Sequence, residues 1–307
     1  MLGQTKPGVL LNMSAPFDIM FHLGAHKTAS THLQNILLDQ TDYMNAHGVQ
    51  YLGPMHMRRG VVRFQQLPKR LWAEFQDAQA ADSWDYHRVV VSEENFLGPL
   101  VSKHGTTLPP PLYKQAVQKL RDFRADAPDI PLHLAICVRN PCALIASSYS
   151  QYLLGGRFKP WDHYIQWLDF GRHDYNWAHL IQRIAGAQVV HSITVWAYKD
   201  YRALLPTIFK RFTGLAPQFS KGAETSLANP SLSADAIAAV TAGQGQGLRM
   251  SELVQTAQAQ YPVGPLHAKF QPWPPQVLHE MTQRYQHQLR QIAAMDGVTF
   301  LRPPKTT

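Results

Sequence analysis

Cysteine and long apolar runs are scarce in this sequence, and each scarcity excludes a class of protein. The chain of 307 residues has 2 cysteines, Cys137 and Cys142, so a disulfide-stapled scaffold is excluded and two reduced thiols are expected. No apolar run reaches the ~18 residues that a membrane-spanning helix needs. The apolar patch before Asn12 is too short for the core of a secretory signal. We therefore expect a cytoplasmic protein without a membrane span.

Charged residues are also few, at 16% of the chain, but their signs are unbalanced. Lys and Arg number 29 against 21 Asp and Glu, which gives a formal net charge of +8. This balance favours an anionic partner, such as a nucleotide, a phosphorylated or sulfated small molecule, a nucleic acid or an acidic membrane surface. A nucleic-acid surface needs dense basic stripes with interleaved aromatics. The compact basic cluster here, at Arg58 and Arg59, is too thin for that, so no nucleic-acid partner is expected.

Apolar residues are plentiful, at 45% of the chain with 10% aromatics, and can build a substantial core. Short apolar runs indicate buried strands at residues 17–24, 49–52, 88–92, 132–138 and 193–197. Apolar residues at helical spacing predict helices over residues 29–40, 67–80, 112–125, 141–154, 161–170, 175–185, 201–212, 234–260 and 276–294. Strands that alternate with helices predict an α/β fold in which a parallel sheet is flanked by helices. We expect one three-layer domain over residues 1–307, with residues 215–307 as its helical elaboration.

Polar and reactive sequences follow three of these strands, and they are the main functional signal. The segments are HLGAHKTAST after the first strand, SEEN after RVVV, and RNP after LHLAICV. In a parallel sheet, ligands bind at the carboxyl ends of the strands. The three segments are therefore expected to meet at one edge of the sheet.

The first of these segments has the composition of a phosphate-binding loop. Small residues let the backbone wrap an anion, the N–H groups at a helix start point toward it, and Lys27 adds a positive charge. The alternative is an ordinary strand–helix turn with a Ser/Thr cap. The loop lacks the spacing of a Walker A motif and the glycines of a dinucleotide fingerprint. The expected ligand-binding residues are Gly24, Ala25, His26, Lys27, Thr28, Ala29, Ser30 and Thr31.

Three histidines lie close together around this loop, at His22, His26 and His32. His22 falls within a strand, and the three side chains do not share one face. We therefore expect no metal site here.

The stretch HKTASTHLQ resembles the 5′-phosphosulfate loop of sulfotransferases, which reads Pro-Lys-Thr-Gly-Thr-Thr or His-Lys-Thr-Gly-Thr-Thr. A second signature of that family is an arginine at a strand end followed by a serine on the next helix, and Arg139 and Ser147 fit it. Weaker matches are the segment from Val195 to Asp200 and Asn229-Pro-Ser231. The resemblance spans roughly residues 17–235 and leaves the C-terminal segment unexplained.

This resemblance implies a P-loop-type α/β sandwich that transfers a sulfuryl group from 3′-phosphoadenosine 5′-phosphosulfate (PAPS). Lys27 would stabilise the leaving oxygen, and Thr28, Ser30 and Thr31 would hold the 5′-phosphate. The 3′-phosphate would bind Arg139, whose planar fork suits a phosphate group, and Ser147.

A general base is needed to accept the proton of the sulfuryl acceptor. Glu93 and Glu94 follow directly after a strand and are the candidates, with Glu93 preferred. Gln151 could line the acceptor site, one helical turn after Ser147. Trp161, Tyr164 and Trp167 are expected in the core, with an aromatic lid over the acceptor as the alternative.

Two other functions stay open from the sequence. A P-loop nucleotide kinase or NTPase would place an acidic Mg²⁺ ligand at Glu93 or Glu94 but lacks its Walker lysine. A non-enzymatic polyanion binder would rely on the basic balance alone. For the sulfotransferase, a carbohydrate, a lipid headgroup or a small molecule with a hydroxyl or amine group is a compatible acceptor.

Overall fold

The computed structural model describes residues 17–58, 66–81, 83, 85–98, 111–168, 175–219, 231–245 and 247–304. Its centre is a six-stranded sheet in the order β2-β3-β1-β4-β5-β6, in which all neighbouring strands are parallel. The strands are β1 (Asp18–His22), β2 (Val49–Leu52), β3 (Arg88–Ser92), β4 (Leu132–Val138), β5 (Ser192–Ala197) and β6 (Val298–Leu301). The predicted α/β fold class is confirmed.

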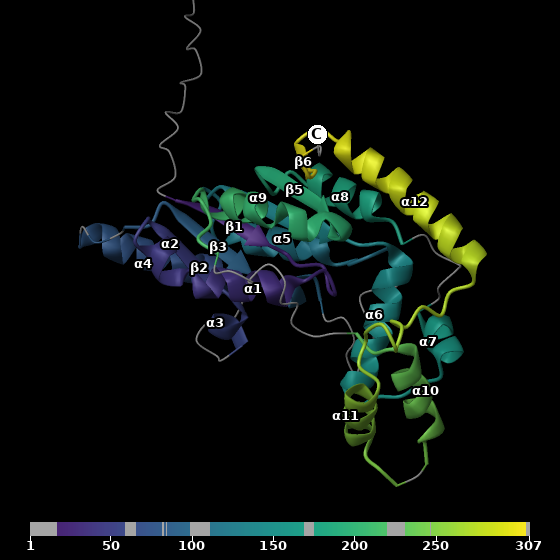
Figure 1. The fold of residues 1–307 in the computed structure, drawn as a ribbon. Helices are drawn as coiled ribbons and strands as arrows, with labels where there is room; N and C mark the ends of the chain where they lie inside the picture. The colour runs from purple at the N-terminus through teal and green to yellow at the C-terminus, as the bar shows by residue number, and fades with distance from the viewer. Residues whose placement is uncertain are drawn as a thin grey trace, which may run out of the picture.

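Helices cover both faces of this sheet, because successive side chains of each strand point to opposite faces. In β1, Met20 packs on the face covered by α1 (Ser30–Asp39) and α9 (Tyr201–Thr213). Ile19 and Phe21 join the larger core on the other face. That face is covered by α4 (Leu67–Ala80), α5 (Ala116–Ala125) and α8 (Trp177–Gly186), as Figure 1 shows.

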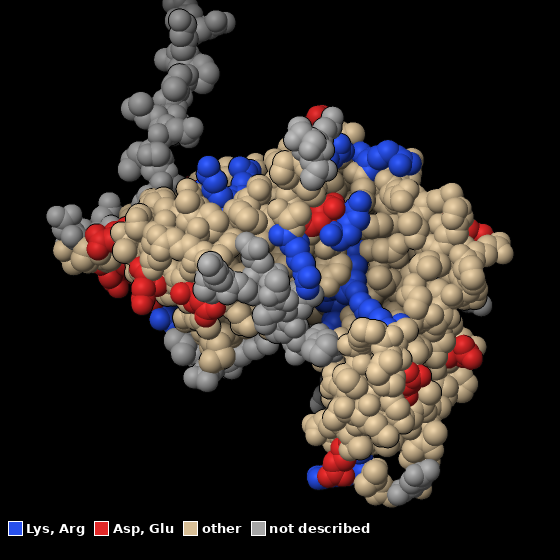
Figure 2. Space-filling view, viewed as in Figure 1, with Lys and Arg blue, Asp and Glu red and all other residues tan. Residues whose placement is uncertain are grey.

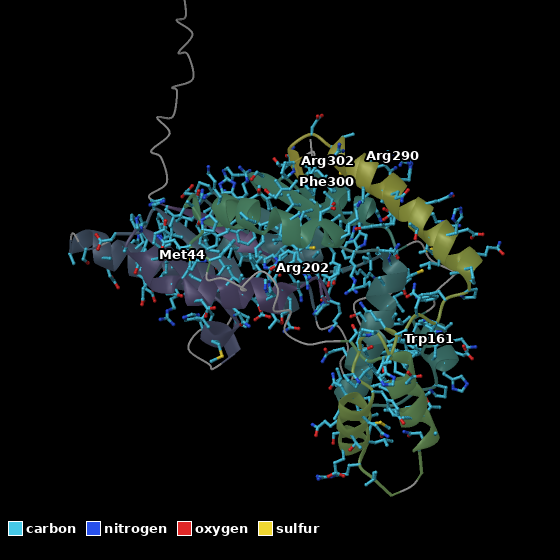
Figure 3. All side chains as sticks on the ribbon, viewed as in Figure 1. Met44, Trp161, Arg202, Arg290, Phe300 and Arg302 are labelled. Atoms are coloured by element: carbon cyan, nitrogen blue, oxygen red, sulfur yellow. The ribbon has the colours of Figure 1, made fainter. Side chains whose placement is uncertain are left out.

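A group of helices stands beside the sheet and is joined to it through α6 (Pro141–Leu154). It comprises α7 (Trp161–Trp167), α10 (Ala234–Ala242) and α11 (Met250–Gln260) (Figure 1). Trp161 lies 5.0 Å from Trp273 and 5.3 Å from Phe270 between ring centroids, and Figure 3 shows it within this group. Tyr164 is fully buried beside the ring of Tyr149. These aromatic residues therefore pack in the core that joins α6, α7 and the segment before α12.

The remaining elements are short or lie at the C-terminal end. They are α2 (Thr41–Asn45), α3 (Pro54–Arg58), the 3-10 turns η2 (Glu94–Leu97) and η3 (Tyr198–Asp200), and α12 (Pro275–Ala293). Helix α12 packs against α6 and α8 and leads into β6, which forms the edge strand beside β5. The sequence prediction did not include α2, α3 or β6. Within the described residues, no helix has both the length and the apolar character to cross a membrane.

The strand order places a crevice between the ends of β1 and β4. Strand β1 lies between β3 and β4, but the chain leaves β1 toward β2 and leaves β4 toward β5, on opposite sides. Where successive connections diverge in this way, the carboxyl ends of the strands border an open crevice that suits a ligand. The loop at Gly24–Ala29 and the turn at Arg139 lie on its two sides.

Candidate active site

The loop that follows β1 has an unusual backbone. Gly24, Lys27 and Ala29 all have positive φ angles, of 47°, 62° and 65°. A Cβ on Gly24 would lie 2.9 Å from Ser30 Oγ and 3.1 Å from Glu94 Cβ, so this position requires glycine. Left-handed conformations cost a residue with a side chain about 1–2 kcal/mol. Strain of this kind accumulates where backbone groups must face a ligand.

The loop ends at the start of α1 without a side-chain cap. Ala29 occupies the N-cap position and has no side chain that accepts a hydrogen bond from the helix. The first N–H groups of a helix have no partner within it, and the helix dipole makes this end attractive to an anion. Ser30 Oγ is buried and has no hydrogen-bond partner among the described residues. The exposed Thr31 follows in the first turn of α1.

His26 anchors the loop to the neighbouring segments. Its backbone N–H donates to the Tyr113 hydroxyl at 3.2 Å, which also lies 3.2 Å from His26 Nδ1. His26 Nε2 lies 3.3 Å from the side-chain oxygen of Asn95, and burial lowers the pKa of the imidazole. Thr28 donates its hydroxyl hydrogen bond within the loop, to the carbonyl of Ala25. Thus His26 and Thr28 maintain the shape of the loop.

Arg139 lies at the end of β4 and is a buried cation of the site. Only 4% of its surface is exposed, and burial lowers the pKa of its guanidinium. The guanidinium donates a hydrogen bond to the backbone carbonyl of Lys27 and lies 4.4 Å from the centre of the Tyr198 ring. Arg139 Nε has no partner among the described residues. The Trp177 indole donates to the Arg139 carbonyl at 2.8 Å and holds the turn in place.

Lys27 projects from the loop toward α6. Its ammonium donates a hydrogen bond to Gln151 Oε1 at 3.1 Å. Burial, followed by the positive charges of Arg139 and Lys269, lowers the pKa of Lys27 to about 8. The ammonium is therefore partly removed from water and has two cationic neighbours.

Lys269 was not predicted from the sequence, because no local motif surrounds it. A short antiparallel bridge pairs it with Ser233, and this bridge brings the segment before α12 to the site. Although much of Lys269 is exposed, partial burial and the nearby Arg139 lower its pKa. Only the three-dimensional arrangement reveals this residue.

A cavity of about 390 Å³ extends from Arg139 toward α12. Its lining contains three cationic residues, Arg139, Lys199 and Lys269, together with the apolar surfaces of Tyr285 and Leu289. Figure 2 shows Lys and Arg side chains gathered in a strip along the hollow between the sheet and the α10–α11 group. Within the described part of the chain, no carboxylate forms an ion pair with Lys27, Arg139 or Lys269. The lining of the cavity therefore combines positive charge with aromatic and aliphatic side chains.

The two predicted acids lie at the end of β3, next to the loop. The buried Glu93 accepts a hydrogen bond from the backbone N–H of Asn95 at 2.9 Å and so caps η2. The half-buried Glu94 accepts one from the Gln34 side chain at 2.7 Å. Glu94 Cβ also borders Gly24, so Glu94 packs directly on the loop.

The remaining residues singled out in the sequence lie in different elements of the fold. Ser147 is buried in α6, which begins just after Arg139. His22 bonds Ser92 at 2.9 Å, and His32 bonds Tyr201 at 2.7 Å. No group of three metal-ligating side chains occurs in the part of the chain that the structure describes. Arg59, Asn229 and Pro230 lie outside the described residues.

Comparisons with known proteins give a distant likeness among solved structures. No protein-family model matches the chain, and no curated protein matches it. Among solved structures, retinol dehydratase in complex with androsterone and the inactive cofactor PAP is 13% identical in sequence. The match covers 95% of this chain and 84% of that one, with a TM-score of 0.32. A likeness at this level carries neither ligand nor activity over to the present chain.

Proposed function

We propose that this protein is a sulfotransferase that moves a sulfuryl group from PAPS to a hydroxyl or amine of an acceptor. The observation that carries the proposal is the buried guanidinium of Arg139, which has cationic neighbours and no acidic partner in the described chain. A buried charge is costly unless an opposite charge compensates it. Arg139, Lys27 and Lys269 repel one another, and an anionic ligand with several charges would relieve that repulsion.

Two buried polar atoms support the fit of a phosphorylated ligand. Ser30 Oγ and Arg139 Nε lack partners among the described residues, and both are hydrogen-bond donors on opposite sides of the crevice. A nucleotide with phosphates at both ends of its ribose brings acceptors to two such places. Ser30, Thr31 and the first N–H groups of α1 would hold the 5′-phosphate. Arg139 and Ser147 would hold the 3′-phosphate, with Lys269 adding charge.

Lys27 supplies the electrostatic part of the reaction. When bound, PAPS provides the sulfuryl group and a leaving oxygen on which negative charge develops. A positioned ammonium stabilises such a charge, more effectively in a crevice that excludes water than in bulk solvent. Burial, followed by the positive charges of Arg139 and Lys269, lowers the pKa of Lys27 to about 8, and a bound anion would raise it again. The negative charge of the bound donor would therefore stabilise the protonated form of Lys27.

Glu93 and Glu94 supply the proton acceptor. The acceptor hydroxyl or amine must lose a proton as it attacks, and a carboxylate within hydrogen-bond reach can take it. Glu94 borders the loop at Gly24, whereas Glu93 caps η2. Glu94 is therefore our choice for the base within the pair. The acceptor class remains a carbohydrate, a lipid headgroup or a small molecule.

A thermal-shift comparison of two nucleotides tests the proposal. We expect 3′,5′-ADP, the desulfonated product, to raise the Tm, because a ligand that binds only the folded state stabilises it. ATP with Mg²⁺ should give a much smaller shift. The absence of a shift with 3′,5′-ADP would overturn the proposal, and Mg²⁺-dependent ATP hydrolysis would favour a P-loop NTPase instead. Transfer of ³⁵S from labelled PAPS to a metabolite extract would then identify the acceptor.

A further inference from the structure

Gln151 is the polar neighbour of the Lys27 ammonium. Helix α6 begins after Arg139 and carries Gln151 in its last turns, so one helix connects the two cations of the site. The helix is firmly seated, because Tyr149 and Leu153 on either side of Gln151 are buried. The Tyr149 hydroxyl also donates to the Lys159 carbonyl at 2.7 Å. The backbone position of Gln151 is therefore fixed by the helix.

The hydrogen bond between Gln151 and Lys27 is not needed to hold the fold together. Gln151 is exposed, and its side chain makes no other hydrogen bond with the described residues. The backbone of the loop is fixed elsewhere, by His26 with Tyr113 and by Arg139 with the Lys27 carbonyl. What Gln151 fixes is the end of the lysine side chain. Such a chain carries about 2 kcal/mol of rotamer entropy when it is unrestrained.

An amide in this position has a different effect from a carboxylate. An amide oxygen accepts a hydrogen bond without adding a negative charge, so the positive charge of Lys27 stays available. A glutamate would form an ion pair with the ammonium, raise its pKa and repel an anionic ligand. An ammonium has three N–H donors, and a single acceptor leaves the others free. The charged groups around Lys27 are Arg139 from the β4–α6 turn and Lys269 from the segment before α12.

We propose that Gln151 is a positioning residue for Lys27. Its amide oxygen holds the ammonium at the mouth of the crevice and leaves the charge and the remaining N–H donors for the sulfated end of the donor. This inference rests on the proposed sulfotransferase function. It predicts that replacing Gln151 by an uncharged residue without an acceptor oxygen lowers kcat more than it changes the KM for PAPS. A misplaced Lys27 ammonium weakens mainly the stabilisation of the transition state.

Three variants test this inference. Gln151→Leu removes the acceptor, Gln151→Glu keeps an acceptor and adds a charge, and Gln182→Leu changes an exposed glutamine on α8 as the matched control. We expect Gln151→Leu to lower kcat by roughly 10- to 100-fold with a small change in KM. Gln182→Leu should leave both constants unchanged. A Gln151→Leu enzyme with wild-type kcat would overturn the positioning role.

A second readout does not depend on activity. The reactivity of Lys27 toward acetic anhydride, followed by mass spectrometry across a pH series, reports the pKa of its amine. We expect the Lys27 titration to move to higher pH in Gln151→Glu and to stay unchanged in Gln182→Leu. An unchanged titration in Gln151→Glu would show that the two side chains do not meet, and would overturn the inference. If the Lys27 titration shifts in Gln151→Glu but the wild-type protein does not bind 3′,5′-ADP, the contact between the two side chains is supported and the sulfotransferase function is rejected.

Discussion

The guanidinium of Arg139 donates a hydrogen bond to the backbone carbonyl of Lys27. This bond ties the turn after β4 to the loop after β1, across the crevice that the strand order creates. The guanidinium of Arg139 and the backbone of Lys27 are therefore fixed relative to each other before any ligand binds. A site that is already arranged in this way loses little free energy to reorganisation when a charged group binds.

Replacement of Arg139 by methionine should remove the preference for a 3′-phosphate. Hydrogen bonds to charged groups contribute about 1.5–3 kcal/mol, which corresponds to roughly a 10- to 100-fold loss of affinity. Isothermal titration calorimetry with 3′,5′-ADP and 5′-AMP separates this effect from general nucleotide binding. The wild-type protein should bind 3′,5′-ADP more tightly, and Arg139→Met should bind both nucleotides similarly. Arg290→Met is the control, since Arg290 lies at the β6 end of α12 (Figure 3).

Replacement of Lys27 by alanine should separate catalysis from stability. Turnover should fall by ~10²–10³, the usual loss when one electrostatic contact to a transition state is removed. The Tm of the ligand-free protein should stay the same or rise, because the repulsion from Arg139 and Lys269 disappears. Steady-state kinetics and thermal denaturation of the same preparation measure the two effects. Unchanged turnover would remove Lys27 from the mechanism.

The pH dependence of stability provides a further test of Lys27. Its pKa is lowered from 10.5 to about 8 in the folded protein. Between these values the unfolded chain binds more protons than the folded one, so this residue adds stability as pH rises through the window. Its destabilising effect is therefore largest below pH 8 and decreases above it. Urea denaturation of wild type and Lys27→Met at pH 7.5 and 9.5 should show a smaller difference at the higher pH. A difference that grows with pH would contradict the assignment.

Matched glutamine variants should distinguish the two acids. Glu94→Gln should lower kcat by ~10²–10⁴ if Glu94 is the general base, with little change in the Tm. Glu93→Gln keeps an acceptor oxygen for the backbone N–H of Asn95, so the cap on η2 should persist and kcat should change less. Kinetics with PAPS and the acceptor identified by ³⁵S transfer measure both. The reverse order of effects would assign the base to Glu93.

The parts of the fold that were predicted from the sequence are those with strong local patterns. The β1 and β4 strands are continuous apolar runs, because both of their faces are buried under helices. Strand β6 lies at the sheet edge and has a partly exposed surface, so its four residues lack that pattern. Helices α2 and α3 are too short to show a helical period.

The candidate site likewise contains residues that local sequence patterns predict and residues that they do not. Arg139 directly follows β4 and Lys27 lies in the loop after β1, so the preference of ligands for the carboxyl ends of parallel strands predicts both. Lys269 reaches the site through a bridge to Ser233, which depends on the arrangement of the whole C-terminal segment. The contact of Gln151 with Lys27 joins residues that are 124 positions apart in the chain, and spacing cannot reveal it.

The last strand of the sheet has a consequence for synthesis on the ribosome. Residues 298–301 complete the sheet beside β5, and Tyr285 on α12 donates to the carbonyl of Val138, next to Arg139. Until these residues have left the ribosome, the outer edge of β5 has no partner strand, and such an edge can pair with other chains. A nascent chain stalled before residue 298 should therefore depend on chaperones. The cationic site can reach its final form only after α12 and β6 have been synthesised.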